Sequence, residues 1–233
     1  MKLSASTLNL FFRCSYAYYL KEIEKKEPVY SDRVFIGQLV HKVLEKYFKY
    51  KKQSPDDPIT LMDFLDEAYD SLEQRPEVIK AENYKDESIS YIQNYEDVAK
   101  NILPKEIEKE FNVDFNDIAI RGFIDLVTED GKVIDFKTTA QSSVKLSVDY
   151  ILQLSIYNLA GLGDSFYIHY ITPKKFVEFN VNPLNTDVLS DILNRFKLQY
   201  ESGVFVPSGL THPFACQYCA YSAYCNFYNS VKL

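Results

Sequence analysis

The first hundred residues carry hydrophobic side chains at helical spacing. Over residues 35–50, apolar residues recur three and four positions apart, which predicts a helix with one buried face. A Ser or Thr near the start of residues 4–20 can serve as the N-cap of a short helix there. Residues 61–103 are predicted to be mostly helical and acidic, with an interruption near Pro76.

The pattern changes after Pro104, where short β-rich runs alternate with helical segments. Their order predicts a mixed sheet flanked by helices, hence an α/β fold with a helical insertion in its first half. No internal repeat interrupts this order. The predicted strands are residues 111–115, 118–127, 133–138, 165–172 and 175–181, and the predicted helices are residues 149–162 and 183–200.

Composition excludes several classes of protein. Hydrophobic residues make up 46% and charged residues 25% of the 233, which rules out a disordered chain. No apolar run is long enough to span a membrane and the start does not resemble a signal peptide, so we expect a cytoplasmic protein without a membrane partner. The net charge of −7 is unevenly distributed along the chain: the segment from Asp63 to Asp130 has a net charge of −12, and the remaining residues have a net charge of +5. A basic nucleic-acid-binding face elsewhere is therefore compatible with the sequence.

Residues 118–139 are predicted to form a β-hairpin around an Asp-Gly turn. With a three-residue loop from Glu129 to Gly131, Gly131 takes the left-handed position and Thr128 faces Lys132. A two-residue loop would shift the register and place the acidic residues of the two strands on opposite faces. The length of the loop therefore decides whether these acids can act together.

In the three-residue register, two carboxylates and one amine converge. Asp125 lies opposite Asp135, and Lys137 shares the face of Asp135 because side chains alternate along a strand. Opposed like charges destabilise a sheet, so we expect a cation between them, and carboxylate oxygens suit Mg²⁺ or Mn²⁺. Such a metal polarises a phosphodiester and lowers the pKa of a water that Lys137 could activate. The alternative is a surface hairpin with solvated charges, although both acids stand within apolar stretches.

Four cysteines stand near the two ends of the chain. Cys216, Cys219 and Cys225 crowd the C-terminus, and Cys14 lies about 200 residues upstream. Four thiolates can form a tetrahedral site for zinc or hold an iron–sulfur cluster, with His212 as a further option for zinc. The remaining alternative is a set of buried thiols without a common role.

Four motifs resemble the RecB-like form of the PD-(D/E)XK nuclease family in both order and spacing. Gly37 and His41 lie four residues apart on one helix face, where glycine leaves room beside the imidazole. The other matches are an acid on one strand, an Asp-x-Lys on the next, and a Gln-xxx-Tyr on the following helix. In chain order the matched residues are Gly37, His41, Asp125, Asp135, Phe136, Lys137, Gln153 and Tyr157.

The resemblance implies a role for each matched residue. Lys137 assists the attacking water, Gln153 supports Lys137 and the scissile phosphate, and Tyr157 contacts the nucleic-acid strand. Four groups bind Mg²⁺ or Mn²⁺: the imidazole of His41, the carboxylates of Asp125 and Asp135, and the backbone carbonyl of Phe136.

The cysteines are similar to the 4Fe–4S clamp of two RecB-like groups, the CRISPR-associated adaptation exonucleases (the Cas-four family) and the AddB nuclease domain. These proteins commonly have Pro after the first Cys, whereas this chain has Ser15. The resemblance implies that Cys14, Cys216, Cys219 and Cys225 hold a 4Fe–4S cluster that joins the two ends of the chain.

The resemblance also implies a restriction-endonuclease-like fold over residues 1–233 as a single domain. Within it we expect a helical region with the Gly-xxx-His motif, a catalytic sheet core and a Cys-rich iron–sulfur lobe. These parts are residues 35–105, residues 110–182, and residues 205–229 together with Cys14.

The expected function is that of a metal-dependent DNA exonuclease, trimming single-stranded DNA or single-stranded ends from the 5′ end. The implied settings are CRISPR adaptation, recombination and repair, or a viral equivalent, with a CRISPR integrase or helicase subunits as partners. The alternative is a catalytically silent scaffold that binds DNA ends and keeps the nuclease fold, and a zinc-based interaction module is a further alternative.

Weaker candidates stand beside these motifs. Glu110 precedes the hairpin where the family often has an acid, and Glu45 lies four residues after His41. His169 is interpreted as a residue of the sheet. The 19 Tyr and 16 Phe could include stacking platforms for single-stranded bases, but we expect most of them to fill the core.

Overall fold

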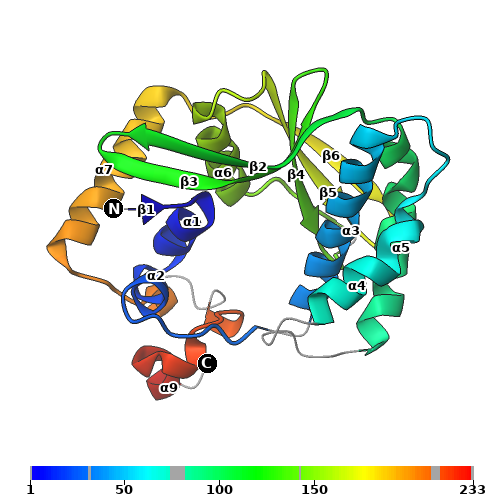
Figure 1. The fold of residues 1–233 in the computed structure, drawn as a ribbon. Helices are drawn as coiled ribbons and strands as arrows, with labels where there is room; N and C mark the ends of the chain where they lie inside the picture. Colours follow the sequence, from blue (N-terminus) through cyan, green and yellow to red (C-terminus); the bar gives the residue numbers. More distant parts are fainter. Residues whose placement is uncertain (1, 31–32, 74–81, 142, 211–215, 232–233) are drawn as a thin grey trace. The chain divides into compact units, whose positions relative to one another are not determined.

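The computed structural model describes residues 2–30, 33–73, 82–141, 143–210 and 216–231 (Figure 1). The chain divides into two compact units. The first unit contains Met1–Ser31, Asn112–Gly122 and Leu184–Leu233, and the second contains Asp32–Phe111 and Phe123–Pro183. Two strands, β2 (Pro104–Phe115) and β3 (Ile118–Thr128), run from one unit into the other.

The second unit contains a mixed sheet, as the sequence predicts. The C-terminal half of β3 pairs antiparallel with β4 (Lys132–Thr138), which pairs parallel with β5 (Ser165–Ile171). β5 in turn pairs antiparallel with β6 (Phe176–Val181). The parallel pair β4 and β5 is connected through a helix, as parallel strands require.

Helices cover both faces of this sheet (Figure 1). On one face, the ring of Phe136 packs near Phe48 of α3 and Tyr95 of α5. On the other face, the neighbouring Asp135 contacts α6 through Gln153, because successive residues of a strand point to opposite sides. The helical elements of the unit are α3 (Val34–Gln53), η1 (Leu61–Phe64), α4 (Leu65–Glu73), α5 (Glu82–Lys100) and α6 (Val148–Leu159).

The apolar stripe of α3 forms the centre of the hydrophobic core. Leu39 and Val43 are completely buried, and Val40 and Leu44 are 1% exposed, as the helical spacing predicts. Each side chain of this kind stabilises the fold by roughly 1.5–3 kcal/mol when fully buried. The predicted acidic helical stretch is present as α4 and α5, and the predicted interruption at Pro76 lies outside the described residues.

The β3–β4 hairpin has the predicted three-residue loop. Leu126 pairs with Ile134 and Val127 with Val133, a register that sets Thr128 opposite Lys132. Gly131 has a φ of +81°, the left-handed conformation that favours glycine. The loop is held at its tip, because the Gly131 carbonyl accepts a hydrogen bond from the Asp164 N–H at 2.8 Å.

The first unit holds two short helices where one was predicted. Residues 4–20 form α1 (Ala5–Arg13) and α2 (Ser15–Glu22), so the prediction of a single helix is wrong. Cys14 is extended, with a φ of −162°, and the Ser15 hydroxyl accepts a hydrogen bond from Val206 N–H at 2.9 Å. This long-range contact fixes the start of α2 apart from α1, whose N-cap Ser4 the sequence does indicate.

The remaining elements of the first unit are a two-residue strand and several helices. β1 (Lys2–Leu3) pairs parallel with β3 at Ala119 and Ile120. The last long helix ends at Gly203, whose φ of +69° gives a left-handed C-cap. The helical elements here are α7 (Thr186–Ser202), η2 (Ser208–Leu210), η3 (Ser222–Tyr224) and α9 (Asn226–Val231).

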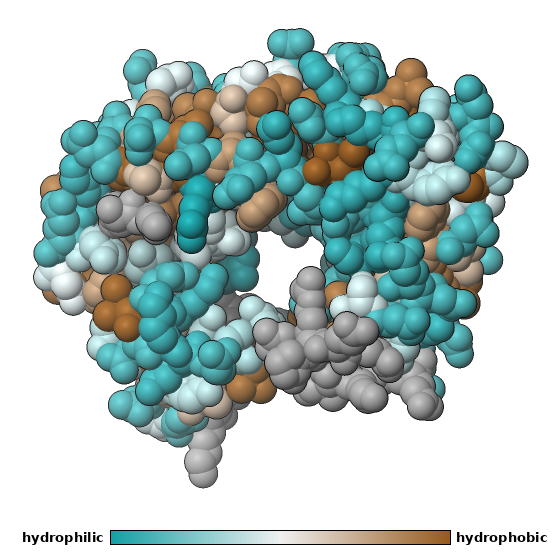
Figure 2. All heavy atoms as spheres, viewed as in Figure 1, coloured by the Kyte–Doolittle hydropathy of each residue, from teal (hydrophilic) through white to brown (hydrophobic). Residues whose placement is uncertain are grey.

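The surface carries mixed polarity. Hydrophilic residues cover most of the face presented in Figure 2, with hydrophobic residues in patches between them. None of the helices in the described ranges is both long enough and apolar enough to span a bilayer.

Candidate active site

The second unit brings the four sequence motifs together. α3 supplies His41, β3 supplies Asp125, β4 supplies the Asp-Phe-Lys run, and α6 supplies the Gln-xxx-Tyr pair. Continuing the hairpin register by one step sets Asp125 opposite Asp135. The side chains of Lys137, Gln153 and Tyr157 all lie within contact of Asp135.

Asp125 is anchored to the opposite strand. Its Oδ2 accepts a hydrogen bond from the backbone N–H of Phe136 at 2.8 Å, one position beyond the backbone pairing of Leu126 with Ile134. His41 Nδ1 lies 3.8 Å from the same oxygen. The His41 side chain remains 32% exposed and that of Asp125 16%, so both groups are accessible from solvent.

Asp135 is the most deeply buried group of the site, with a side chain that is 1% exposed. Lys137 Nζ lies 2.5 Å from Asp135 Oδ2, yet this oxygen has no hydrogen bond of acceptable geometry. A buried carboxylate oxygen compensated only by charge is costly, which marks the position as one that a cation would stabilise.

The Gln-xxx-Tyr pair holds the other oxygen of Asp135. Gln153 Nε2 donates to Asp135 Oδ1 at 2.6 Å and also to the Tyr157 hydroxyl at 2.7 Å. The Tyr157 hydroxyl in turn donates to Asp135 Oδ1 at 3.3 Å. Tyr157 is 4% exposed, so in this structure both residues orient Asp135.

Charge and burial shift the pKa values of this group. Burial raises the pKa of Asp135 to about 6; the Lys137 amine opposes the rise, and the Asp125 carboxylate adds to it. Burial acts to lower the pKa of Lys137, but the two carboxylates outweigh it, so the net shift is upward and the amine stays protonated. The site is therefore an ion-paired cluster with two acids that compete for positive charge.

Gly37 makes room for the neighbouring strand. A Cβ added at Gly37 would lie 2.8 Å from Oγ1 of Thr138, the last residue of β4. The expectation that this glycine leaves space beside the imidazole of His41 is wrong, because the nearest atom belongs to Thr138. Its role is to let α3 approach the strand that carries Lys137.

Glu108 is an acid that is electrostatically coupled to Asp125 and that the sequence reasoning missed. Burial first, then the carboxylates of Asp125 and Glu45, raise the pKa of Glu108 to about 7, whereas the alternative candidate Glu110 is exposed. Glu108 has a φ of 48° within β2, which breaks the regular alternation of a strand. Alternation alone would have placed both glutamates on one face, so the sequence carries no signal that separates them.

The residues present fit a hard divalent cation. Two opposed carboxylates, one of which has a buried oxygen without a hydrogen bond, and an imidazole are a donor set that suits Mg²⁺ or Mn²⁺. Among the described residues, no group of three or more His, Cys, Asp or Glu side chains lies close enough together to hold a metal ion. The amine of Lys137 forms an ion pair with Asp135.

The four cysteines meet in the first unit. Cys14, Cys216, Cys219 and Cys225 line one small pocket of about 20 Å³. Burial and the neighbouring sulfur atoms raise the pKa of Cys216 and of Cys219. The thiols are not arranged as a metal-holding group within the described residues, and His212 lies outside them.

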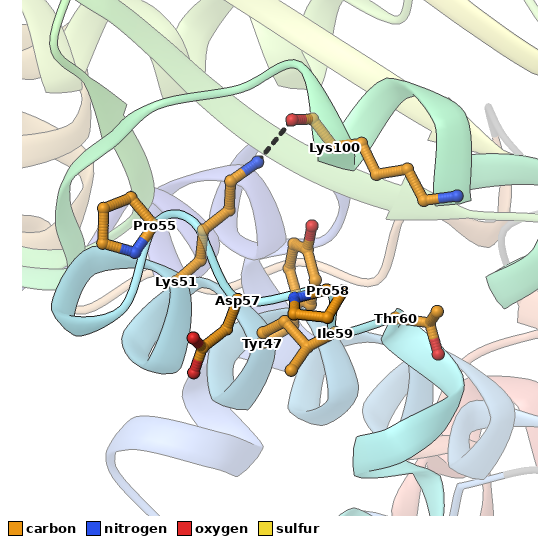
Figure 3. Close-up of a pocket in the computed structure, with 8 residues that line it drawn as sticks. All are labelled: Tyr47, Lys51, Pro55, Asp57, Pro58, Ile59, Thr60 and Lys100. Atoms are coloured by element: carbon orange, nitrogen blue, oxygen red, sulfur yellow. Dashed lines mark hydrogen bonds between the residues drawn. The ribbon is translucent and has the colours of Figure 1, made fainter.

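A separate pocket of about 350 Å³ lies at the far end of α3 (Figure 3). Lys51 projects into it and donates hydrogen bonds to the carbonyls of Ala99 (3.0 Å) and Lys100 (2.5 Å). This buried lysine thus caps the C-terminal end of α5, where a positive charge is favourable. The lining residues are Tyr47, Lys51, Pro55, Asp57, Pro58, Ile59, Thr60 and Lys100, none of which belongs to the predicted site.

Comparison with known proteins gives a match over nearly the whole chain. The profile described as "PD-(D/E)XK nuclease superfamily" matches residues 2–226. Several proteins of Streptococcus pyogenes, each named as a subunit of an "ATP-dependent helicase/deoxyribonuclease", are 26–27% identical over 204 residues. The aligned region covers 75% of this chain but 19% of those relatives.

Two solved structures share the fold. A candidate exonuclease from Eubacterium rectale is 14% identical, with a TM-score of 0.60 over 90% of this chain and 85% of that one. The protein SSO0001 is 16% identical, with a TM-score of 0.50 over 97% of this chain and 85% of that one. At these identities the likeness concerns the fold alone.

Proposed function

Because the chain belongs to the PD-(D/E)XK nuclease superfamily, we propose that it hydrolyses phosphodiester bonds of DNA at the site formed by β3, β4 and α6. The observation that carries the proposal is the hairpin register, which sets Asp125 opposite Asp135 with Lys137 beside them. A binding module has no use for two opposed acids and a buried amine. The mixed sheet between helices is the fold expected for such a nuclease.

The metal would be Mg²⁺ or Mn²⁺, held by His41, Asp125, Asp135 and the Phe136 carbonyl. When bound, it would supply Lewis-acid stabilisation of the charge that develops on the phosphate. Lys137 would orient the attacking water and provide positive charge beside the scissile group. Gln153 and Tyr157 would keep Asp135 in place through their bonds to Oδ1. Glu108, whose pKa the Asp125 carboxylate helps to raise, is a further acidic group that could accept a proton.

The finer proposal is an exonuclease acting on single-stranded DNA or single-stranded ends, with 5′ to 3′ polarity. Its support is the motif resemblance to RecB-like nucleases and the similarity to a deoxyribonuclease subunit. Helicase subunits are proposed as partners because the matched relatives are named helicase/deoxyribonuclease subunits. A CRISPR integrase is the alternative partner, which the resemblance to the Cas-four family supports.

We also propose that the four cysteines hold a 4Fe–4S cluster. The support is that thiols from both ends of the chain line one pocket. A zinc ion is the alternative occupant, since tetrahedral thiolate sites suit both. In either case the site would join α1 and α2 to the C-terminal segment and contribute to folding.

The test is degradation of end-labelled single-stranded DNA with Mn²⁺ or Mg²⁺, using anaerobically purified protein and the Lys137→Ala variant. Cleavage by the wild type that is lost in the variant supports the nuclease and its site, and the position of the label gives the polarity. Equal activity in both proteins contradicts the proposed site. DNA binding without cleavage in either protein supports a scaffold in place of a nuclease.

A further inference from the structure

The Lys137 amine is held from two sides. Asp135 contacts it as an ion pair, and the ring of Tyr150 lies with its centroid 5.0 Å from Nζ. A cation at this distance from an aromatic ring is attracted by the negative charge of the ring face. Only 21% of the Lys137 side chain is exposed, which limits competition from water.

The Tyr150 ring is itself fixed. It stands in the first turn of α6 and packs edge-on against Tyr170, with ring centroids 5.8 Å apart. Tyr170 is the β5 partner of Lys137 in the sheet, and its hydroxyl donates to the Lys145 carbonyl at 3.2 Å. Phe179 of β6 also packs edge-on against Tyr170, again with ring centroids 5.8 Å apart.

A ring has an advantage over a second carboxylate at this position. Asp135 belongs to the proposed metal site, so its negative charge would be shared between the metal and Lys137. A carboxylate in place of Tyr150 would add a competing metal ligand, whereas an aromatic ring attracts the amine without coordinating Mg²⁺ or Mn²⁺. The ring can therefore hold the amine when Asp135 is engaged.

We propose that Tyr150 is a positioning residue that keeps the Lys137 amine in place for phosphodiester hydrolysis, a role that rests on the proposed nuclease function. Two observations support this role: Tyr150 contacts the Lys137 amine, and its ring packs against Tyr170, which in turn packs against Phe179. A different role for Tyr150 would be to stack on a nucleobase of the substrate. Loss of such stacking would weaken substrate binding and raise KM, whereas loss of positioning would lower kcat, so kinetic measurements distinguish the two roles.

The kinetic test compares Tyr150→Leu, which removes the ring, with Tyr150→Phe, which keeps it. We expect kcat on single-stranded DNA with Mn²⁺ to fall about tenfold for the leucine variant, with KM within twofold of wild type. The phenylalanine variant should stay within about threefold in kcat. Tyr167→Leu is the matched control, because Tyr167 faces Lys132 in the same sheet at 5.9 Å and lies outside the site. A raised KM at constant kcat, or equal loss in both Tyr150 variants, overturns the proposal.

A second measurement does not depend on activity. Reductive methylation with ¹³C-formaldehyde keeps the charge of lysine and gives each amine an NMR signal, and the signal of Lys137 is the one lost in Lys137→Arg. A neighbouring ring should displace this signal, and Tyr150→Leu but not Tyr167→Leu should return it to the position of ordinary lysines. An undisplaced signal in the wild type overturns the proposal. A displaced signal in a protein that cleaves no DNA would refute the nuclease function and leave the ring contact established.

Discussion

The carboxylate of Asp125 accepts a hydrogen bond from the backbone N–H of Phe136 at 2.8 Å, so one acid of the hairpin is tied to the residue that follows the other. The regular backbone pairing between the two strands extends to Leu126 and Ile134. At the next position the Asp125 side chain, instead of the backbone, accepts the hydrogen bond from the partner strand. Asp125 thus has two separable properties: an oxygen that completes the sheet and a charge that is available to a metal.

Asp125→Asn should separate these properties. The asparagine can keep an oxygen acceptor for Phe136, so we expect stability to change by less than about 1 kcal/mol. Loss of the charge should lower nuclease activity about 100-fold or more, since metal binding supplies several kcal/mol. Denaturant unfolding and the end-labelled DNA assay measure the two effects.

Asp125→Ala is the matched comparison, because it leaves the Phe136 N–H without its partner. Its unfolding free energy should be lower than that of the wild type by about 1–3 kcal/mol. If Asn and Ala destabilise the protein equally, the hydrogen bond to Phe136 does not stabilise it.

Gly37→Ala should destabilise the protein in spite of the higher helix propensity of alanine, which favours the change by about 1 kcal/mol. The added Cβ would lie 2.8 Å from Thr138 Oγ1, so helix and strand must move apart or the threonine must rotate. We expect a net loss of about 1–2 kcal/mol in unfolding free energy. Adding Thr138→Ala should recover most of this loss, and failure of the double variant to do so would locate the conflict elsewhere.

The cysteine site can be tested by colour and metal content. A protein that holds a 4Fe–4S cluster should be brown after anaerobic purification, with iron and sulfide bound, and a zinc protein should be colourless. Cys216→Ser should lose the metal and lower the melting temperature, because the site contributes folding energy. A metal-free wild type with unchanged stability in the variant would show that the four thiols have no common ligand.

His169 should make the stability depend on pH. Burial, with a smaller contribution from Lys132, lowers the pKa of His169 to about 3, and the ring lies between the Tyr95 hydroxyl and Glu178. Below pH 6.5 the unfolded chain binds a proton at this histidine, while the folded protein does not until the pH approaches 3. Stability from this group is therefore complete above pH 6.5 and is lost as the pH falls toward 3.

At about pH 5 this contribution should be smaller by about 2 kcal/mol than at about pH 7.5. Most carboxylates titrate below that range, and Asp135 and Glu108, which titrate within it, are unchanged in the variant. His169→Phe should therefore reduce the slope of unfolding free energy between these two pH values by the contribution of the histidine. An unchanged slope in the variant would show that His169 is not buried as a neutral ring.

The sequence predicts the parts of the fold that periodicity controls. The apolar stripe of α3, the mixed sheet and the hairpin loop around Gly131 all follow from spacing and turn chemistry, and each is confirmed. The break at Cys14 does not follow, because it depends on the bond between Ser15 and Val206, almost 200 residues apart.

The candidate site likewise has residues that local sequence patterns predict and residues that they do not. Asp125, Asp135 and Lys137 follow from strand alternation, whereas Glu108 depends on a left-handed φ that no local residue type signals. β2 begins at Pro104, earlier than predicted, because charged residues such as Lys105 and Lys109 conceal its pattern. Long-range contacts and backbone irregularities are the features that a single sequence leaves undetermined.

Contacts made by the tip of the β3–β4 hairpin restrict the insertion of residues at this turn. The Gly131 carbonyl bonds to Asp164 N–H, the Glu129 N–H donates to the Leu103 carbonyl, and a Cβ at Gly163 would lie 2.7 Å from Gly131 O. Exposed turns ordinarily accept inserted residues at little cost. Here an inserted residue would break contacts with two other connections and slip the register by which the acids of the hairpin face each other, so this turn should be intolerant of insertion.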